Sequence, residues 1–105
     1  MKQSRSVLIV EDEQATRDLL HAQLSTDFEV RTAGNGEEAL AALGARTFDL
    51  MLLDMNLPGI TGLDVMRQLH EIEKAPTVIV VSADSNVSSA VDALREGAYD
   101  YLVKP

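Results

Sequence analysis

Cysteine and tryptophan are absent from the chain, and its aromatic residues are limited to two tyrosines and two phenylalanines. Without cysteine, disulfides, thiolate catalysis and cysteine-ligated metals are excluded. Hydrophobic residues make up 46% of the 105 residues, an ordinary fraction for a globular core, so aliphatic side chains must fill that core. The length suits a single domain.

Positive charge is also scarce, because nine lysines and arginines face 17 aspartates and glutamates, which gives a formal net charge of −8. This balance argues against direct binding of nucleic acid, whose phosphates would be repelled. Long hydrophobic runs are missing as well. The first apolar stretch, residues 7–10, is too short for a signal peptide or a membrane span. We therefore expect a cytoplasmic domain with neither a nucleic-acid nor a membrane partner.

The sequence does contain a regular alternation of short apolar runs and amphipathic segments. Apolar runs predict strands, and apolar residues at helical spacing predict helices. We expect five strands, at residues 7–10, 27–32, 48–53, 77–81 and 98–103. Four helices are expected between them: residues 13–24, a helix from a cap at Asn35 to Gly44, one from a cap at Thr61 to about Ile72, and one from a cap at Asp84 or Ser85 to Gly97 that carries Val87, Val91 and Leu94.

Helices between successive strands predict a parallel sheet with helices on both faces and right-handed crossovers. All runs except the amphipathic second one are predicted to be buried, so the second strand belongs at an edge. This pattern fits a doubly wound, flavodoxin-like α/β fold whose five strands follow the order 2-1-3-4-5. The first helix would cover one face of the sheet and the next three helices the other.

Part of one sheet face lacks cover in this prediction. The topology needs a fifth helix beside the first, and the sequence stops at Pro105 before such a segment. We therefore expect residues 1–105 to be one domain truncated before its final helix. Such a fragment should expose apolar sheet surface and self-associate, for example as a homodimer.

The predicted central strands all end in polar or charged residues. Glu11 and Asp12 follow the first strand, Asp54 the third, Ser82 the fourth and Lys104 the fifth. Ligands of open parallel sheets bind beyond the carboxyl ends of the strands, so these side chains should share one cleft.

Three carboxylates in one cleft repel each other, and a hard divalent cation with oxygen ligands relieves that repulsion. An open site with few carboxylates favours Mg²⁺. We expect Asp12, Asp54 and the backbone carbonyl of Asn56 to bind the metal, with Glu11 assisting through a water molecule.

A cation, a lysine and a hydroxyl around one carboxylate suit phosphoryl transfer, which demands positioning and charge stabilisation. Asp54 would be the nucleophile and form an acyl phosphate. Ser82 would hydrogen-bond one phosphoryl oxygen, and Lys104 would neutralise another.

Four segments carry a resemblance to a known family: residues 10–13 (VEDE), 52–59 (LLDMNLPG), 80–83 (VVSA) and 104–105 (KP). In this order and spacing, the chain resembles the receiver domain of two-component response regulators over its whole length. The resemblance implies Mg²⁺-dependent phosphorylation of Asp54 by the phosphohistidine of a sensor histidine kinase or phosphotransfer protein. It also implies an output domain beyond Pro105. Residues 90–105 are similar to receivers fused to AAA+ transcription activators.

The resemblance further implies a switch. Ser82 would move toward the phosphoryl group, and Tyr101, which we expect beside the missing helix, would turn inward to follow it. The peptide bond between Lys104 and Pro105 would be cis. The signalling surface would include residues 87–95 and Tyr101. Two departures are visible, because Ser82 stands where the family often has threonine and Glu11 where it often has aspartate.

Several of these residues also have simpler structural interpretations. Ser82 could cap a loop, and Tyr101 could only pack. Asp84, which together with Asn56 tunes the lifetime of the acyl phosphate in the family, could equally cap the fourth helix. The two histidines, His21 and His70, are expected to face solvent.

Other functions fit parts of the pattern. A hydrolase of the haloacid-dehalogenase type also uses a strand-end aspartate and Mg²⁺, but it needs a second acid two residues later, where this chain has Asn56. A flavodoxin-like cofactor binder needs a first loop rich in glycine, serine and threonine, and residues 11–14 (EDEQ) would instead repel phosphate. A receiver used only for protein contacts would not need the intact acids, hydroxyl and lysine.

Overall fold

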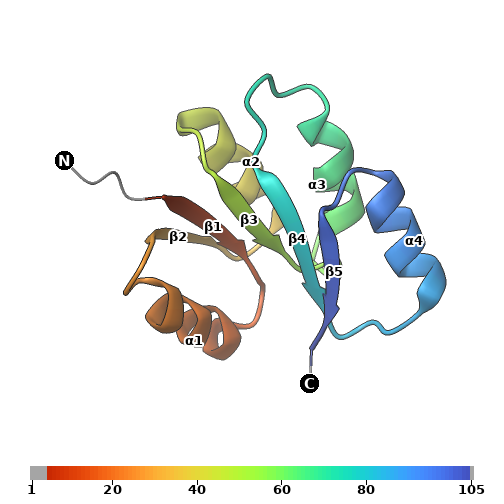
Figure 1. Ribbon diagram of the computed structural model, residues 1–105, viewed down its shortest axis with the longest axis horizontal. Helices are drawn as coiled ribbons and strands as arrows, with labels where there is room; N and C mark the ends of the chain where they lie inside the picture. The colour runs from red at the N-terminus through yellow and green to blue at the C-terminus, as the bar shows by residue number, and fades with distance from the viewer. Residues whose placement is uncertain (1–4, 105) are drawn as a thin grey trace.

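A computed structural model describes residues 5–104 of the chain. Its elements follow one another in the order β1 (Ser6–Val10), α1 (Gln14–Leu24), β2 (Glu29–Ala33), α2 (Gly36–Ala45), β3 (Leu50–Leu53), α3 (Gly62–Leu69), β4 (Thr77–Ser82), α4 (Val87–Arg95) and β5 (Asp100–Val103). The strands form one parallel sheet in the order β2-β1-β3-β4-β5 (Figure 1). The predicted fold class and strand order are confirmed. The bond between Lys104 and Pro105, implied to be cis, lies outside the described residues.

Two apolar layers lie on opposite faces of this sheet, as predicted. On one face α1 covers β1 and β2, where Leu20 and Leu24 pack against a small cluster of Val7, Ile9 and Val30. On the other face α2, α3 and α4 cover the main core (Figure 1). The largest buried side chains of that core are Leu8, Val10, Met51, Leu53, Val65, Met66 and Val80. Since successive residues of a strand point to opposite faces, β1 supplies both layers and is buried along its whole length.

Helices α2 and α3 begin with the predicted caps, Asn35 and Thr61. The Thr61 hydroxyl accepts the N–H of Asp64 at 3.1 Å, and the Asp64 carboxylate accepts the N–H of Thr61 at 3.0 Å, which is a reciprocal capping box. The N–H and the hydroxyl of Thr61 together lower the pKa of Asp64. At the start of α2, Asn35 Oδ1 accepts the N–H of Glu38 at 2.8 Å. These caps fix where the β2–α2 and β3–α3 loops end.

The predicted end of α2 at Gly44 is wrong, because the helix continues to Ala45. The chain leaves the helix at Arg46, whose backbone is extended. The Arg46 guanidinium stabilises the chain at this point, because it pairs with Glu29 at 2.7 Å and lies 5.1 Å from the centre of the Phe48 ring. The predicted end of α4 is confirmed: Gly97 follows it with a φ of 108°, in the left-handed region that favours glycine. The third helix ends at Leu69, three residues earlier than predicted.

The predicted cap of α4 at Asp84 or Ser85 is also wrong. Asn86 caps this helix, because its Oδ1 accepts the N–H of Ser88 at 2.9 Å. Residues 84–86 are all of types that can cap a helix. Asp84 instead forms a turn within the loop before α4, because its Oδ1 accepts the N–H of Asn86 at 2.8 Å.

The larger apolar residues of α4 lie on its exposed side, with Val87 75%, Val91 36% and Leu94 47% accessible to solvent. The helix instead buries Ala93, which lies on a second stripe of small residues. Small side chains allow α4 to approach the sheet closely, and the larger apolar residues are then turned outward.

The prediction that the fifth strand is buried is wrong too. β5 pairs only with β4 and forms an edge of the sheet. Leu102 is 49% exposed and Val103 50% exposed. Leu102 lies beside Val81 on the face that α1 covers only over β1 and β2.

We expect the polypeptide of residues 1–105 to self-associate through this part of the sheet, since contiguous exposed apolar surface favours association. Leu102→Gln should shift the population toward monomer in sedimentation velocity, because it places an amide in the buried contact. Leu94→Gln, a similarly exposed leucine on the opposite face, serves as the control and should leave the distribution unchanged. A parent protein that stays monomeric at high concentration would contradict this prediction.

Candidate functional site

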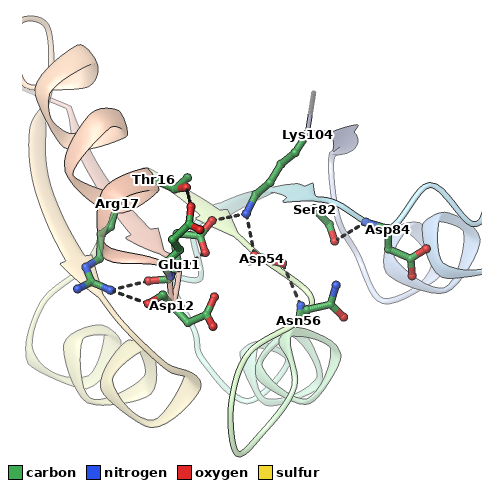
Figure 2. Close-up of polar contacts among 10 residues, drawn as sticks. Glu11, Asp12, Thr16, Arg17, Asp54, Asn56, Ser82, Asp84 and Lys104 are labelled. Atoms are coloured by element: carbon green, nitrogen blue, oxygen red, sulfur yellow. Dashed lines mark hydrogen bonds and ion pairs between the residues drawn. The ribbon is translucent and has the colours of Figure 1, made fainter.

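Four of the predicted site residues, Glu11, Asp12, Asp54 and Lys104, meet at the carboxyl end of the sheet (Figure 2). One carboxylate oxygen from each of the three acids lies within 4.8 Å of the others. The side chains of Glu11 and Asp54 are 4% and 8% exposed, whereas Asp12 is open to solvent. Oxygen ligands around one Mg²⁺ at about 2.1 Å lie roughly 3–4 Å apart. The three carboxylates are the kind of donor that this ion prefers, and a limit of 4.8 Å leaves them close enough for small side-chain movements to reach that spacing.

The sheet itself places the two buried acids side by side. The β1–β3 register pairs Val10 with Leu53, so the next residues, Glu11 and Asp54, are neighbours. Their backbones are still held by the sheet, since the N–H of Asp54 donates to the Val10 carbonyl at 3.0 Å and that of Glu11 to the Ala33 carbonyl at 3.0 Å. Backbone pairing thus fixes two carboxylates against each other.

Lys104 neutralises this pair. Its Nζ donates to Asp54 Oδ2 at 2.9 Å and also to Glu11 Oε1. Burial raises the pKa of Glu11, against the opposing effect of the bonds from Lys104 and the N–H of Glu13. Burial alone lowers the pKa of Lys104, but its bonds to the two carboxylates outweigh this and leave the pKa raised. The lysine is therefore held protonated in the middle of the site.

The second oxygen of Asp54 is also bound. Asp54 Oδ1 accepts the N–H of Asn56 at 3.0 Å, which fixes the orientation of the carboxylate. Gly62, the first residue of α3, packs directly behind it: a Cβ at Gly62 would lie 2.6 Å from the Asp54 carbonyl oxygen and 2.7 Å from Met55 Cα. Only glycine lets α3 begin so close to the Asp54 backbone.

An open groove of about 780 Å³ lies over these groups. Asp12, Asp54, Asn56 and Lys104 line it at the sheet, and α1 forms one wall with Thr16 and Leu19 among its lining residues. The carboxylates are thus reachable from solvent at the surface where Asp12 is exposed. A ligand can therefore approach Asp54 from this groove.

Ser82 lies at the end of β4 but is turned into the protein. It is fully buried, and its Oγ accepts the N–H of Asp84 at 3.2 Å. Among the contacts of the described residues, no hydrogen bond joins Ser82 to Asp54. The expectation that all five side chains surround one cavity therefore holds for four of them, with the Ser82 hydroxyl engaged one strand away.

Tyr101 is half-buried, and its position differs from the prediction. Its ring packs against the main core, on the face opposite α1, rather than beside the uncovered part of the sheet. Its hydroxyl donates to the Asp84 carbonyl at 2.6 Å. The Asp84 carboxylate accepts the Ser89 hydroxyl at 2.6 Å, and this bond and the N–H of Asn86 lower its pKa. Strand β5 and the β4–α4 loop are tied together through Asp84.

Sequence reasoning did not single out Arg17. Its Nη1 donates to the Glu11 carbonyl at 2.8 Å and lies 3.4 Å from the Asp12 carbonyl (Figure 2). The signal available was an arginine one helical turn after the acidic loop, on the first helix. The predicted solvent exposure of His21 and His70 is confirmed. Within residues 5–104, no helix has the length and apolar character needed to cross a membrane.

Comparison with known proteins gives matches along nearly the whole chain. Residues 7–105 match the family described as the response regulator receiver domain. The chain is 42% identical over 101 residues to the sensory transduction protein RegX3 of Mycolicibacterium smegmatis, covering 95% of this chain and 44% of that protein. It is 41% identical over 105 residues to the alginate biosynthesis transcriptional regulatory protein AlgB of Pseudomonas aeruginosa, covering 99% of this chain and 23% of that protein. The chain thus spans less than half the length of these relatives.

A solved structure is similar over most of both chains. The response regulator protein TrrA of Thermotoga maritima, in complex with Mg²⁺ and BeF, superposes with a TM-score of 0.84 at 35% identity, covering 96% of this chain and 87% of that one. This likeness supports the fold.

Proposed function

Since the chain belongs to the response regulator receiver domain family of two-component signalling, we propose that Asp54 is its phosphoryl acceptor and that Mg²⁺ is its cofactor. The observation that carries this proposal is the setting of Asp54. Its buried carboxylate lies between a lysine and two further acids, with both oxygens already oriented by Lys104 and the N–H of Asn56. The donor would be the phosphohistidine of a sensor histidine kinase or phosphotransfer protein.

In this reaction an oxygen of Asp54 attacks phosphorus, an O–P bond forms, and the N–P bond to the donor histidine breaks with its electrons returning to that ring. Bound Mg²⁺ would supply positive charge to the transferring phosphoryl oxygens. Glu11, Asp12 and Asp54 would hold the ion through carboxylates, and Asn56 through its carbonyl. Lys104, whose ammonium has three donors and two carboxylate partners, would donate through the third to a phosphoryl oxygen.

The remaining residues of the proposal concern the response to phosphorylation. The Ser82 hydroxyl would donate to a phosphoryl oxygen, and its bond from the N–H of Asp84 couples it to the β4–α4 loop. Tyr101 contacts the same loop, because its hydroxyl donates to the Asp84 carbonyl. A shift of this loop would alter the exposed face of α4, where Val87, Val91 and Leu94 are accessible. An output domain would respond to that face, and a relative such as AlgB has room for one beyond the 23% of its length that the chain covers.

We expect acetyl phosphate with Mg²⁺ to add one phosphoryl group to the parent protein, detected by intact mass and removed by hydroxylamine. Asp54→Asn should abolish the label, because the amide cannot form an acyl phosphate. Asp18→Asn, which changes an exposed acid on α1, is the matched control and should label normally.

A label that persists in Asp54→Asn, or that forms equally well without a divalent cation, would contradict the proposal. Repeated release of phosphate from added phosphate monoesters would instead favour a hydrolase.

A further inference from the structure

The loop between β1 and α1 carries two of the three acids, and its conformation decides where their carboxylates point. The Glu11 side chain is held at both oxygens, because Oε2 accepts the N–H of Glu13 at 3.1 Å and Oε1 accepts Lys104. The N–H of Glu11 is bound to the sheet through Ala33. These contacts do not involve the backbone carbonyl oxygens of Glu11 and Asp12.

Arg17 binds these carbonyl oxygens. From the first turn of α1 its guanidinium reaches back to the Glu11 carbonyl at 2.8 Å, with the Asp12 carbonyl 3.4 Å from the same nitrogen (Figure 2). A guanidinium has several donors in a fixed plane, so one group can engage neighbouring acceptors of a loop. Arg17 thus links the helix to the main chain of both acidic residues.

Two neighbouring features, Gly34 and the start of α1, give Arg17 room and a structural role. Gly34, in the β2–α2 loop, leaves room for the guanidinium, since a Cβ there would lie 3.2 Å from Nη1. The N–H of Gly34 donates to Glu38 Oε1 at 2.9 Å, which holds that loop in place. At the start of α1, the Glu13 side chain accepts the Thr16 hydroxyl but makes no cap bond to a backbone N–H, so the main chain of the first turn lacks the usual side-chain cap. Arg17 provides an anchor in its place.

We propose that Arg17 is a positioning residue of the metal site, which holds the main chain of Glu11 and Asp12 so that their carboxylates face Asp54. This inference rests on the proposed function. In the structure the guanidinium binds carbonyl oxygens of the loop rather than the three carboxylates. Groups that orient metal ligands in this way influence affinity without touching the ion.

The sign of the effect separates positioning from simple charge. Loss of a cation near three acids strengthens the attraction for Mg²⁺ by Coulomb's law alone. Loss of positioning weakens binding, because the free carboxylates must be ordered when the ion binds. The two explanations therefore predict opposite changes in affinity for a variant that removes the arginine.

The test is the Mg²⁺ dissociation constant of the full chain, measured by isothermal titration calorimetry with MgCl₂. Arg17→Met, which keeps an unbranched side chain, should weaken binding about tenfold, the lower range for lost ligand-orienting contacts. Arg17→Lys keeps the charge and should lie between Arg17→Met and the parent. The control Arg31→Met removes an exposed cation from β2 and should leave affinity unchanged or slightly tighter. Labelling of Arg17→Met by acetyl phosphate should recover at saturating Mg²⁺.

Unchanged or tighter Mg²⁺ binding by Arg17→Met, with a parent-like circular dichroism spectrum, would overturn the inference. If that variant does not fold, Arg17→Lys decides by the same criterion, since a charge effect alone predicts no change in it. Asp12→Asn is measured alongside: if it binds Mg²⁺ as tightly as the parent, the proposed metal site itself fails. Weak binding by Asp12→Asn together with parent-like binding by Arg17→Met rejects only the role of Arg17.

Discussion

Lys104→Met is expected to destabilise the protein by about 3 kcal/mol when Mg²⁺ is absent. The substitution removes the cation that bonds to both Glu11 and Asp54, whose side chains are 4% and 8% exposed. Removing one partner of a largely buried ion pair leaves uncompensated charge, which costs roughly 3–5 kcal/mol, and we take the lower value because Lys104 is 22% exposed. Urea unfolding followed by circular dichroism measures the difference.

Two conditions should reduce this loss. Saturating Mg²⁺ should restore much of the stability, since an ion that binds only the folded state stabilises it by mass action and replaces the missing positive charge. Acidic pH should also narrow the gap between variant and parent. Burial raises the pKa of Glu11, so a proton is bound more tightly in the folded state and replaces the lysine as pH falls.

The exposed Lys74 provides the control, because Lys74→Met removes the same charge away from the acids and should change stability little. Equal stabilities of Lys104→Met and Lys74→Met without Mg²⁺ would show that the lysine does not offset the repulsion between the acids.

Gly62→Ala and Gly44→Ala should change stability in opposite directions. The new Cβ at position 62 would approach the Asp54 carbonyl oxygen at 2.6 Å and Met55 Cα at 2.7 Å, and neither is a side-chain end that can move aside. Forcing a methyl group into packed backbone costs about 3 kcal/mol. At position 44 nothing lies within 4 Å of a new Cβ, and the residue is helical, so alanine should stabilise by about 0.5–1 kcal/mol.

Thermal and urea unfolding of both variants checks this pair. The displacement at Gly62→Ala acts directly on the Asp54 backbone, so its labelling by acetyl phosphate should slow as well, while Gly44→Ala labels like the parent. A Gly62→Ala protein as stable as the parent would mean that α3 can move away from the β3–α3 loop without loss.

The sheet order could be predicted from sequence because the information is local and repeated. Each strand is a short apolar run followed by an amphipathic helix, and right-handed crossovers leave few arrangements. The caps at Asn35 and Thr61 were predictable for the same reason, since each is an isolated capping residue at the start of an apolar stripe. The β4–α4 loop offers three such residues in a row, so the choice of Asn86 depends on tertiary packing.

Burial was harder to predict than secondary structure. The apolar residues of α4 and β5 show which surfaces are suited to burial. They do not show whether another element packs on those surfaces, because that depends on the tertiary structure. Ala93 is fully buried while Val87 is 75% exposed, because close approach to the sheet favours the smaller residue. The face on which Tyr101 lies could not be predicted for a related reason, since the face of a strand residue follows from register rather than composition.

The acids and the lysine could be predicted because strand ends converge at one edge of a parallel sheet. The orientation of the Ser82 hydroxyl and the contact of Arg17 with loop carbonyls could not, because both depend on side-chain rotamers and on main-chain acceptors that a sequence pattern does not specify.

The contacts of Lys104 join positions that are 93 and 50 residues apart along the chain. During synthesis, therefore, Glu11 and Asp54 leave the ribosome long before the cation that compensates them. Contacts between such distant positions form late, since the intervening chain must be ordered first. The proposed phosphoryl-accepting site is thus assembled only after β5 has been made, and a nascent chain shorter than 104 residues lacks the lysine that completes it.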